Sequence, residues 1–301
     1  MRHQQPSFMV SSGGIELAVY TAGTAPKIGE DKPVLLFAQG FPDRAFFWDR
    51  IVALLQDQCF IITFDLRGTG QSTPVKGVKP YHYDALVNDV YAVIEAMSPH
   101  HPVQLVGHDW GGIYGWEVCQ DQRAIGRIKT FYTLSPSLDQ IGLWMRRRLL
   151  KPTPKHLYQL FSQLFRNSLM LFFALPLLPV LLWRSSLAAK MMGYLYRKFE
   201  GLTFEPYDSL QQDAISFLGI YRANLLRKVL MPKPQPCLVP VHALIAQRDP
   251  FLPPWTFEVA PDWAADYRQT YIDASHWAPL SQSKRIAELI EQGFTAPQSQ
   301  D

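Results

Sequence analysis

The sequence predicts an α/β protein whose sheet is mostly parallel and covered by helices on both faces. Short continuous apolar runs alternate with helical segments through the first half of the chain, a pattern typical of strands buried on both sides. The alternation stops at Ser135–Pro136, and long helical stretches punctuated by proline follow. It returns at Val239–Ala246 and closes with a helix at Lys284–Gly293.

Each expected strand is a short, largely apolar run bounded by turn residues. In chain order these strands are Ile15–Tyr20, Val34–Ala38, Phe60–Phe64, Val103–Val106, Ile128–Leu134, Val239–Ala246 and Arg268–Ile272. The expected helices of the core are Phe46–Leu55, Tyr83–Met97, Ile113–Gln120 and Lys284–Gly293. We therefore expect an α/β core of the eight-stranded type at residues 1–136 and 237–301, interrupted by a helical lid at 137–236.

The composition indicates a folded protein with a full core. The 301 residues are 48% hydrophobic and only 18% charged, which excludes a disordered chain. The net charge of +3 is too small to indicate a nucleic-acid partner. Three scattered cysteines fit buried, reduced thiols of an intracellular protein. The first ten residues hold no apolar stretch long enough for a signal peptide, so the expected location is cytoplasmic.

One segment, Leu169–Trp183, is an unbroken apolar run of fifteen residues. A membrane-spanning helix needs about 20 residues, and Pro176 and Pro179 would break this one. Two interpretations remain. The sequence favours a lid packed over an apolar pocket, but peripheral contact with an anionic membrane also fits, because basic residues surround the run. They are Arg146–Arg148, Lys151, Arg166, Arg184, Arg197 and Lys198.

A reactive centre is indicated by Gly107–Gly111, "GHDWG", which directly follows an apolar strand. Its glycines allow a strand to turn sharply into a helix, with one side chain at the tip of the turn. That side chain belongs to Asp109, which would face the cleft at the carboxyl end of the sheet. Taken alone, the motif leaves two alternatives: a nucleophile, or an aspartate that caps the next helix.

Three further turns favour the nucleophile. "FAQGFPD" (37–43) follows a strand and can aim the Phe41 amide at the cleft, and Trp110 supplies a second amide. "ALIAQRDP" (243–250) places Asp249 after a late strand, and "DASHWAPL" (273–280) places His276 after the last one. The order nucleophile, acid, histidine is that of an α/β-hydrolase triad.

These motifs, with "DLRGTGQS" (65–72), resemble the α/β-hydrolases of the epoxide hydrolase and haloalkane dehalogenase group over nearly the whole chain. The most similar branch is the epoxide hydrolase-like domains that are sometimes fused to short-chain dehydrogenases. The resemblance implies Asp109 as nucleophile, His276 as the base that activates water, and Asp249 as the acid that orients it. Phe41 and Trp110 would form the oxyanion hole, and no metal or organic cofactor is required. Tyr221, in "GIYRANLLRK" (219–228), resembles the lid tyrosine that protonates the epoxide oxygen.

The sequence departs from the family pattern at two positions. Gln39 stands where histidine is usual, and Leu169 stands where a second lid tyrosine is expected. Leucine cannot donate a proton, and the sequence does not select a replacement among Tyr158, Tyr194 and Tyr196.

The expected reaction is hydrolysis of an apolar epoxide to a diol through an ester on Asp109. A carboxylate suits this chemistry because it can attack an sp³ carbon. The alternatives are a haloalkane dehalogenase, which would use the Trp110 indole to hold halide, and a weakly catalytic ligand-binding protein. Small apolar organic molecules and water are the expected partners. The candidate pocket residues are Leu143, Trp144, Phe161, Phe165, Phe172, Phe173, Trp183 and Phe217.

Overall fold

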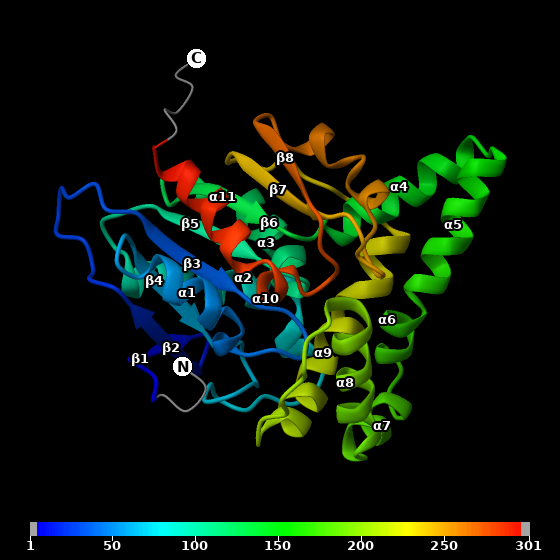
Figure 1. The fold of residues 1–301 in the computed structure, drawn as a ribbon, viewed down its shortest axis with the longest axis horizontal. Helices are drawn as coiled ribbons and strands as arrows, with labels where there is room; N and C mark the ends of the chain where they lie inside the picture. The colour runs from blue at the N-terminus through cyan, green and yellow to red at the C-terminus, as the bar shows by residue number, and fades with distance from the viewer. Residues whose placement is uncertain (1–4, 296–301) are drawn as a thin grey trace.

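The computed structural model describes residues 5–295 and contains one eight-stranded sheet (Figure 1). The strand order is β1-β2-β4-β3-β5-β6-β7-β8. β1 and β4 pair with β2 in antiparallel fashion, and every other neighbouring pair is parallel, which confirms the predicted fold class. The strands are β1 (Phe8–Ser12), β2 (Ile15–Ala22), β3 (Val34–Ala38), β4 (Phe60–Phe64), β5 (Val103–Gly107), β6 (Ile128–Thr133), β7 (Val241–Ala246) and β8 (Tyr267–Ile272).

Helices cover both faces of the sheet (Figure 1). One face carries α1 and α11, which pack on each other, and α2 and α3 form a second pair. The predicted helix at Phe46–Leu55 is a short 3₁₀ turn, Ala45–Trp48, followed by α1. These core helices are α1 (Asp49–Leu55), α2 (Tyr83–Met97), α3 (Trp110–Gln120), α10 (Ala278–Ser281) and α11 (Ser283–Thr295).

Six helices and no strand lie between β6 and β7, and we call this segment, Leu138–Leu230, the helical insertion. The apolar run Leu169–Trp183 is divided between α6 and α7, with Pro176 in the turn that separates them. Within residues 5–295, no helix is both long and apolar enough to cross a membrane. The helices are α4 (Leu138–Leu150), α5 (Pro154–Arg166), α6 (Ser168–Phe173), α7 (Leu178–Arg184), α8 (Leu187–Glu200) and α9 (Leu210–Leu230).

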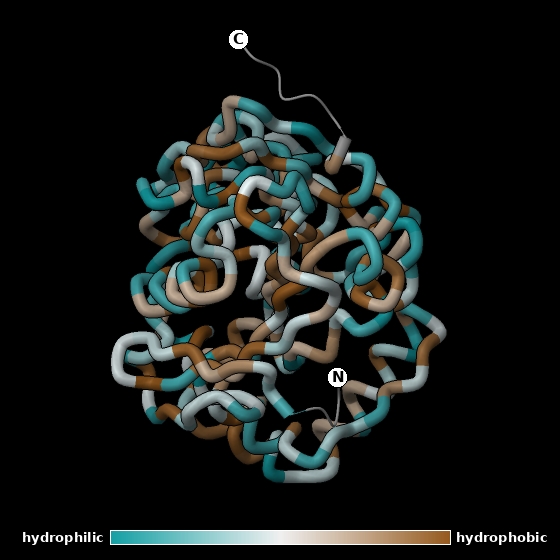
Figure 2. The backbone as a smooth tube through the Cα atoms, turned by 90° about the vertical axis from the view of Figure 1, so that its left-hand side faces the viewer, coloured by the Kyte–Doolittle hydropathy of each residue, from teal (hydrophilic) through white to brown (hydrophobic). Residues whose placement is uncertain are grey.

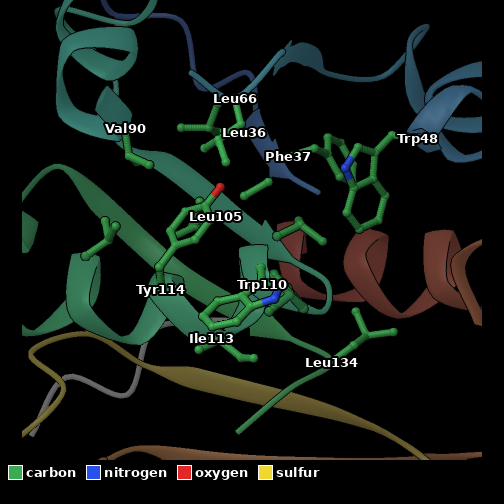
Figure 3. Close-up of a cluster of buried hydrophobic side chains, with 14 of the residues drawn as sticks. Leu36, Phe37, Trp48, Leu66, Val90, Leu105, Trp110, Ile113, Tyr114 and Leu134 are labelled. Atoms are coloured by element: carbon green, nitrogen blue, oxygen red, sulfur yellow. The ribbon is translucent and has the colours of Figure 1, made fainter. Parts of the chain in front are cut away.

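The main hydrophobic core is built on the central strands. Every residue of β3, β4 and β5 is buried, which explains why these strands consist largely of apolar residues. Figure 2 shows apolar stretches running through the middle of the molecule and hydrophilic ones at many outer turns. In Figure 3, Trp110 and Ile113 of α3 point into the same cluster as Leu36 of β3 and Leu105 of β5. The three cysteines are buried free thiols.

Candidate active site

Asp109 lies at a strained turn between β5 and α3. Its φ of 49° and ψ of −123° make it the one non-glycine residue with positive φ among residues 5–295. Although it occupies the N-cap position of α3, its side chain makes no capping hydrogen bond. Its Oδ2 instead accepts the backbone N–H of Phe41 at 2.8 Å. The helix-cap interpretation is therefore wrong, and the strain presents the carboxylate to a cavity.

Two glycines permit this turn to pack against the end of β3. A Cβ on Gly111 would lie 2.0 Å from the carbonyl oxygen of Ala38, and one on Gly40 would lie 2.3 Å from Cβ of Asp109. Real Cβ atoms do not approach other atoms this closely, so both positions require glycine. The small residues seen around Asp109 in the sequence therefore serve the close approach of α3 and β3.

Replacing Gly111 with alanine should lower the free energy of unfolding by about 1–3 kcal/mol or more, because backbone must move to admit the methyl group. Gly193, inside α8, is a matched control, since a Cβ there meets no atom within 4 Å. Gly193→Ala should leave stability unchanged or raise it by up to about 1 kcal/mol. Urea denaturation of both variants measures the difference, and equal stabilities would contradict the packing described.

His276 lies between two carboxylates that come from different turns. Its Nδ1 is 2.9 Å from Oδ2 of Asp249, and its Nε2 is 3.9 Å from Oδ1 of Asp109. Asp249 is fixed in turn by its Oδ1, which accepts the backbone N–H groups of Phe251 at 2.7 Å and Leu252 at 2.9 Å. The structure thus brings Asp109, Asp249 and His276 together, as the sequence predicts, with His276 between the two carboxyl groups.

Burial and charge set the protonation states of this group. Burial lowers the pKa of His276, but the Asp249 carboxylate and then Asp109 outweigh it and raise the pKa to about 9. Burial raises the pKa of Asp249, yet His276 and the two amides bring it below its usual value. Burial also raises the pKa of Asp109, against the opposing effects of His276 and of the Phe41 and Trp110 amides. In the free protein, the two carboxyl groups therefore favour the protonated form of the His276 ring.

The cavity above Asp109 is almost entirely apolar. Its lining includes Asp109, His276 and one side chain that bears a hydroxyl group, that of Tyr221 on α9. Burial raises the pKa of Tyr221 well above its usual value, so its phenol stays protonated and can donate. The remaining lining residues are Phe41, Ile113, Leu169, Met170, Phe173, Met191, Met192, Leu195, Phe251, Leu252 and Trp277.

The structure corrects several expectations about the helical insertion. Leu169 lines the cavity, whereas the suggested replacement tyrosines do not. Tyr158 and Tyr194 are exposed, and Tyr196 is buried against Trp277 with ring centroids 4.4 Å apart. Of the aromatic side chains expected in the pocket, only that of Phe173 lines it. The prediction was wrong for Phe161 and Phe165 because their side chains face solvent.

Two further buried residues, to which the sequence analysis assigned no role, lie near the triad. His108 is buried and its Nε2 lies 2.8 Å from the backbone carbonyl oxygen of His276; burial lowers its pKa to about 3, so the neutral ring donates there. Asp43 is buried, with no hydrogen-bond partner for its Oδ2. Burial, then Asp109, raise the pKa of Asp43 to about 8. The sequence offered one signal for Asp43, its place in "GFPD".

Gln39, where the family pattern has histidine, is also accounted for. Its side-chain amide donates to the carbonyl oxygen of Phe64 at 2.8 Å, which ties the turn after β3 to the end of β4.

Among residues 5–295, no group of three or more His, Cys, Asp and Glu side chains is placed to hold a metal ion.

Comparisons with known proteins give consistent matches. A family model described as the alpha/beta hydrolase fold matches residues 33–282. A curated protein named probable oxidoreductase EphD, from Mycobacterium tuberculosis, is 29% identical over 95% of this chain and 49% of its own length. Epoxide hydrolase 4 of Mus musculus is 24% identical over 86% of this chain and 72% of its own length. The chain thus spans about half the length of the first of these relatives.

Solved structures show the same fold at lower identity. An epoxide hydrolase from Bacillus megaterium in complex with an inhibitor has a TM-score of 0.73 at 21% identity, over 95% of this chain and 99% of that one. A mutant of an epoxide hydrolase from the same organism, complexed with its diol product, has a TM-score of 0.76 at 20% identity, with the same coverage.

Proposed function

This chain belongs to the α/β-hydrolase fold family, and we propose that it is an epoxide hydrolase that converts apolar epoxides to diols through an ester on Asp109. The observation that carries the proposal is the apolar cavity that holds Asp109, His276 and the phenol of Tyr221 together. A nucleophile, a base and a proton donor are the three groups that this reaction needs. The similarity to proteins named epoxide hydrolases supports the same conclusion.

In the first step Asp109 attacks an epoxide carbon. Its Oδ2 is held by the Phe41 amide, which leaves Oδ1 as the attacking atom. As the new carbon–oxygen bond forms, the epoxide carbon–oxygen bond breaks, and the released oxygen takes the proton of the Tyr221 hydroxyl. The product of this step is an ester between Asp109 and a β-hydroxyalkyl group, with Tyr221 left as a tyrosinate that water reprotonates.

In the second step water breaks the ester. Neutral His276 removes a proton from water, and the hydroxide attacks the carbonyl carbon of the Asp109 ester. The backbone N–H groups of Phe41 and Trp110 stabilise the tetrahedral oxyanion, an effect typically worth about 10²–10³ in rate per donor. The ester bond then breaks, the alkoxide takes the proton from His276, and the diol leaves. Asp109, released as a carboxylic acid, gives its proton to the hydroxide formed when water reprotonated Tyr221, so both groups return to their starting states. In this account the helical insertion acts as a lid over the cavity.

The pH dependence of ester hydrolysis should reflect the loss of the negative charge of Asp109 when the ester forms. In the free protein, Asp249 and Asp109 overcome the effect of burial and raise the pKa of His276 to about 9. Esterification neutralises Asp109, so the pKa of His276 should fall and the neutral base should form near neutral pH. We expect the single-turnover rate of ester hydrolysis, measured by rapid quench, to rise with pH through a midpoint below 9. A midpoint at or above that of the free protein would contradict this coupling.

Dehalogenation is the main alternative, and two observations disfavour it. The Trp110 indole, which would hold halide, is fully buried and does not line the cavity. The Phe41 side chain, at the usual place of a second halide donor, is apolar and packs against Phe173 and Tyr221. A protein that only binds ligands is disfavoured by the contact between His276 and Asp249, which supplies a base.

A panel of substrates tests the proposal directly. The protein should convert apolar epoxides to diols, detected by mass spectrometry, and should release no halide from chloroalkanes or bromoalkanes. Halide release without diol formation would contradict the proposal and show that the protein is a dehalogenase. Inertness towards both classes would favour the ligand-binding alternative.

A further inference from the structure

The α5 helix buries two glutamine side chains and exposes most of its apolar side chains, unlike a helix that packs on a protein core. The side chains of Gln159 and Gln163 face inward and are buried. Gln163 donates to the backbone carbonyl oxygen of Phe251 at 2.9 Å, and Gln159 accepts from Arg148 at 3.0 Å. The inward face of α5 is therefore held largely by hydrogen bonds close to Asp249. Leu160 is also buried there, and the other apolar residues of α5 are left on the outside.

The outward stripe of α5 continues as exposed apolar residues in α6 and α7. The α5 residues follow helical spacing, so they share one side of the helix. Phe161 and Phe165 are 70% and 82% exposed, and Leu177, between α6 and α7, is 70% exposed. We call this set the outer apolar face. It consists of Leu157, Tyr158, Phe161, Leu164, Phe165, Leu171, Leu175, Leu177, Leu178 and Leu181.

Clusters of exposed apolar side chains mark contact with another molecule. In Figure 1, α5 and α7 lie at the edge of the molecule, on the far side of the insertion from the strands β1 and β2. This part of the chain is also strongly basic. From Gln140 to Phe199 there are ten Lys and Arg residues and no Asp or Glu. Arg147 and Arg148 form ion pairs with Asp262 and Glu258, whereas Lys151, Lys155 and Arg184 are exposed near the ends of α5 and α7.

We propose that the outer apolar face docks on an anionic lipid bilayer. Aromatic and leucine side chains beside lysine and arginine are the combination that inserts into the headgroup region of acidic membranes. A second copy of the same face is a poorer partner, because both faces would carry the same positive charge. The proposal commits to peripheral contact, in which the side chains enter the interface and no helix crosses the bilayer.

The position of α6 gives this surface a role in substrate delivery. Leu169, Met170 and Phe173 of α6 line the cavity above Asp109, and Leu171 of the same helix belongs to the outer apolar face. A single short helix thus separates the cavity from the bilayer. An apolar epoxide dissolved in the membrane would reach Asp109 without crossing water. This part of the inference rests on the proposed function.

Vesicle flotation tests the docking without any substrate. The protein should float with vesicles of phosphatidylcholine and phosphatidylglycerol, more weakly at high salt, and less with phosphatidylcholine alone. Phe161→Ser with Phe165→Ser should weaken binding at least about tenfold. Ile28→Ser with Ile125→Ser is the matched control, since both isoleucines are exposed outside the insertion, and it should bind as the wild type does.

A charge variant separates lipid from other partners. Lys151→Glu with Lys155→Glu should weaken binding to the anionic vesicles at least about tenfold, whereas Lys76→Glu with Lys284→Glu, which alters exposed lysines of the core, should not. Failure of the wild type to float, or equal binding by the phenylalanine variant, would overturn the proposal. The proposal would also be overturned if light scattering showed that the wild type is a dimer and that the Phe161→Ser, Phe165→Ser variant is a monomer.

Delivery is tested by comparing two substrates. Anionic vesicles should raise the wild-type rate several-fold on an epoxide with a long alkyl chain and leave the rate on a short water-soluble epoxide unchanged. The Phe161→Ser, Phe165→Ser variant should keep the second rate and lose the stimulation of the first. If vesicles bind but no epoxide is hydrolysed, the proposed function fails and docking stands. If both epoxides are hydrolysed and vesicles do not bind, docking fails alone.

Discussion

Replacing Asp109 with asparagine should lower turnover of every epoxide substrate by at least about 10⁴-fold. The amide lacks the negative charge that attacks an sp³ carbon, and no other carboxylate can take its place. Asp249 directs its carboxylate at His276. Asp43 is buried, which raises the pKa of its carboxyl group and disfavours the charged form that could attack. Steady-state diol formation measures the effect.

Two controls keep this result interpretable. Asp57→Asn makes the same chemical change at an exposed position and should retain full activity. Thermal unfolding of Asp109→Asn should match that of the wild type or exceed it, because the substitution removes a partly desolvated charge. Substantial activity in a correctly folded Asp109→Asn variant would show that another group attacks the substrate.

Replacing Tyr221 with phenylalanine should lower the rate of epoxide opening by about 10²–10⁴-fold, the usual cost of losing a general acid. No second tyrosine can replace the lost proton donor. Leu169 supplies no hydroxyl, and no other tyrosine within residues 5–295 lines the cavity. Single-turnover measurement of ester formation isolates this step. The later hydrolysis of the ester, which does not use the phenol, should keep its rate.

Tyr114→Phe is the matched control for this substitution. Tyr114 is buried, its hydroxyl has no hydrogen-bond partner within the described residues, and it does not line the cavity. Its replacement should leave both steps unchanged. If Tyr221→Phe opened epoxides as fast as Tyr114→Phe does, the proton would have to come from elsewhere, and the role given to Tyr221 would be wrong.

The sequence was informative wherever local chemistry decides structure. β3 and β4 were predicted to the residue because each is a buried apolar run between turns. β1, Phe8–Ser12, was missed because an edge strand that exposes Phe8 and Met9 lacks that pattern. The triad turns were predictable because glycine and proline fix backbone shape beside the reactive side chains.

Features that depend on tertiary packing were not predictable in this way. Gln163 is buried and Phe165 exposed on the same helix, the reverse of their hydropathy, because Gln163 finds partners in Asn167 and the Phe251 carbonyl. The unpartnered oxygen of Asp43 likewise depends on which residues surround it in the fold. The charge pattern around α5 to α7 was visible in the sequence, but the side that faces solvent was not.

The most direct test of the account is the mass of the protein itself. With His276 replaced by glutamine, the base that activates water is lost, while Asp109 and Tyr221 remain. After incubation with an apolar epoxide, intact mass spectrometry should show one added substrate mass, and peptide mapping should place it on Asp109. An unmodified variant alongside a wild type that hydrolyses the same epoxide, or an adduct on another residue, would contradict the aspartate-ester mechanism.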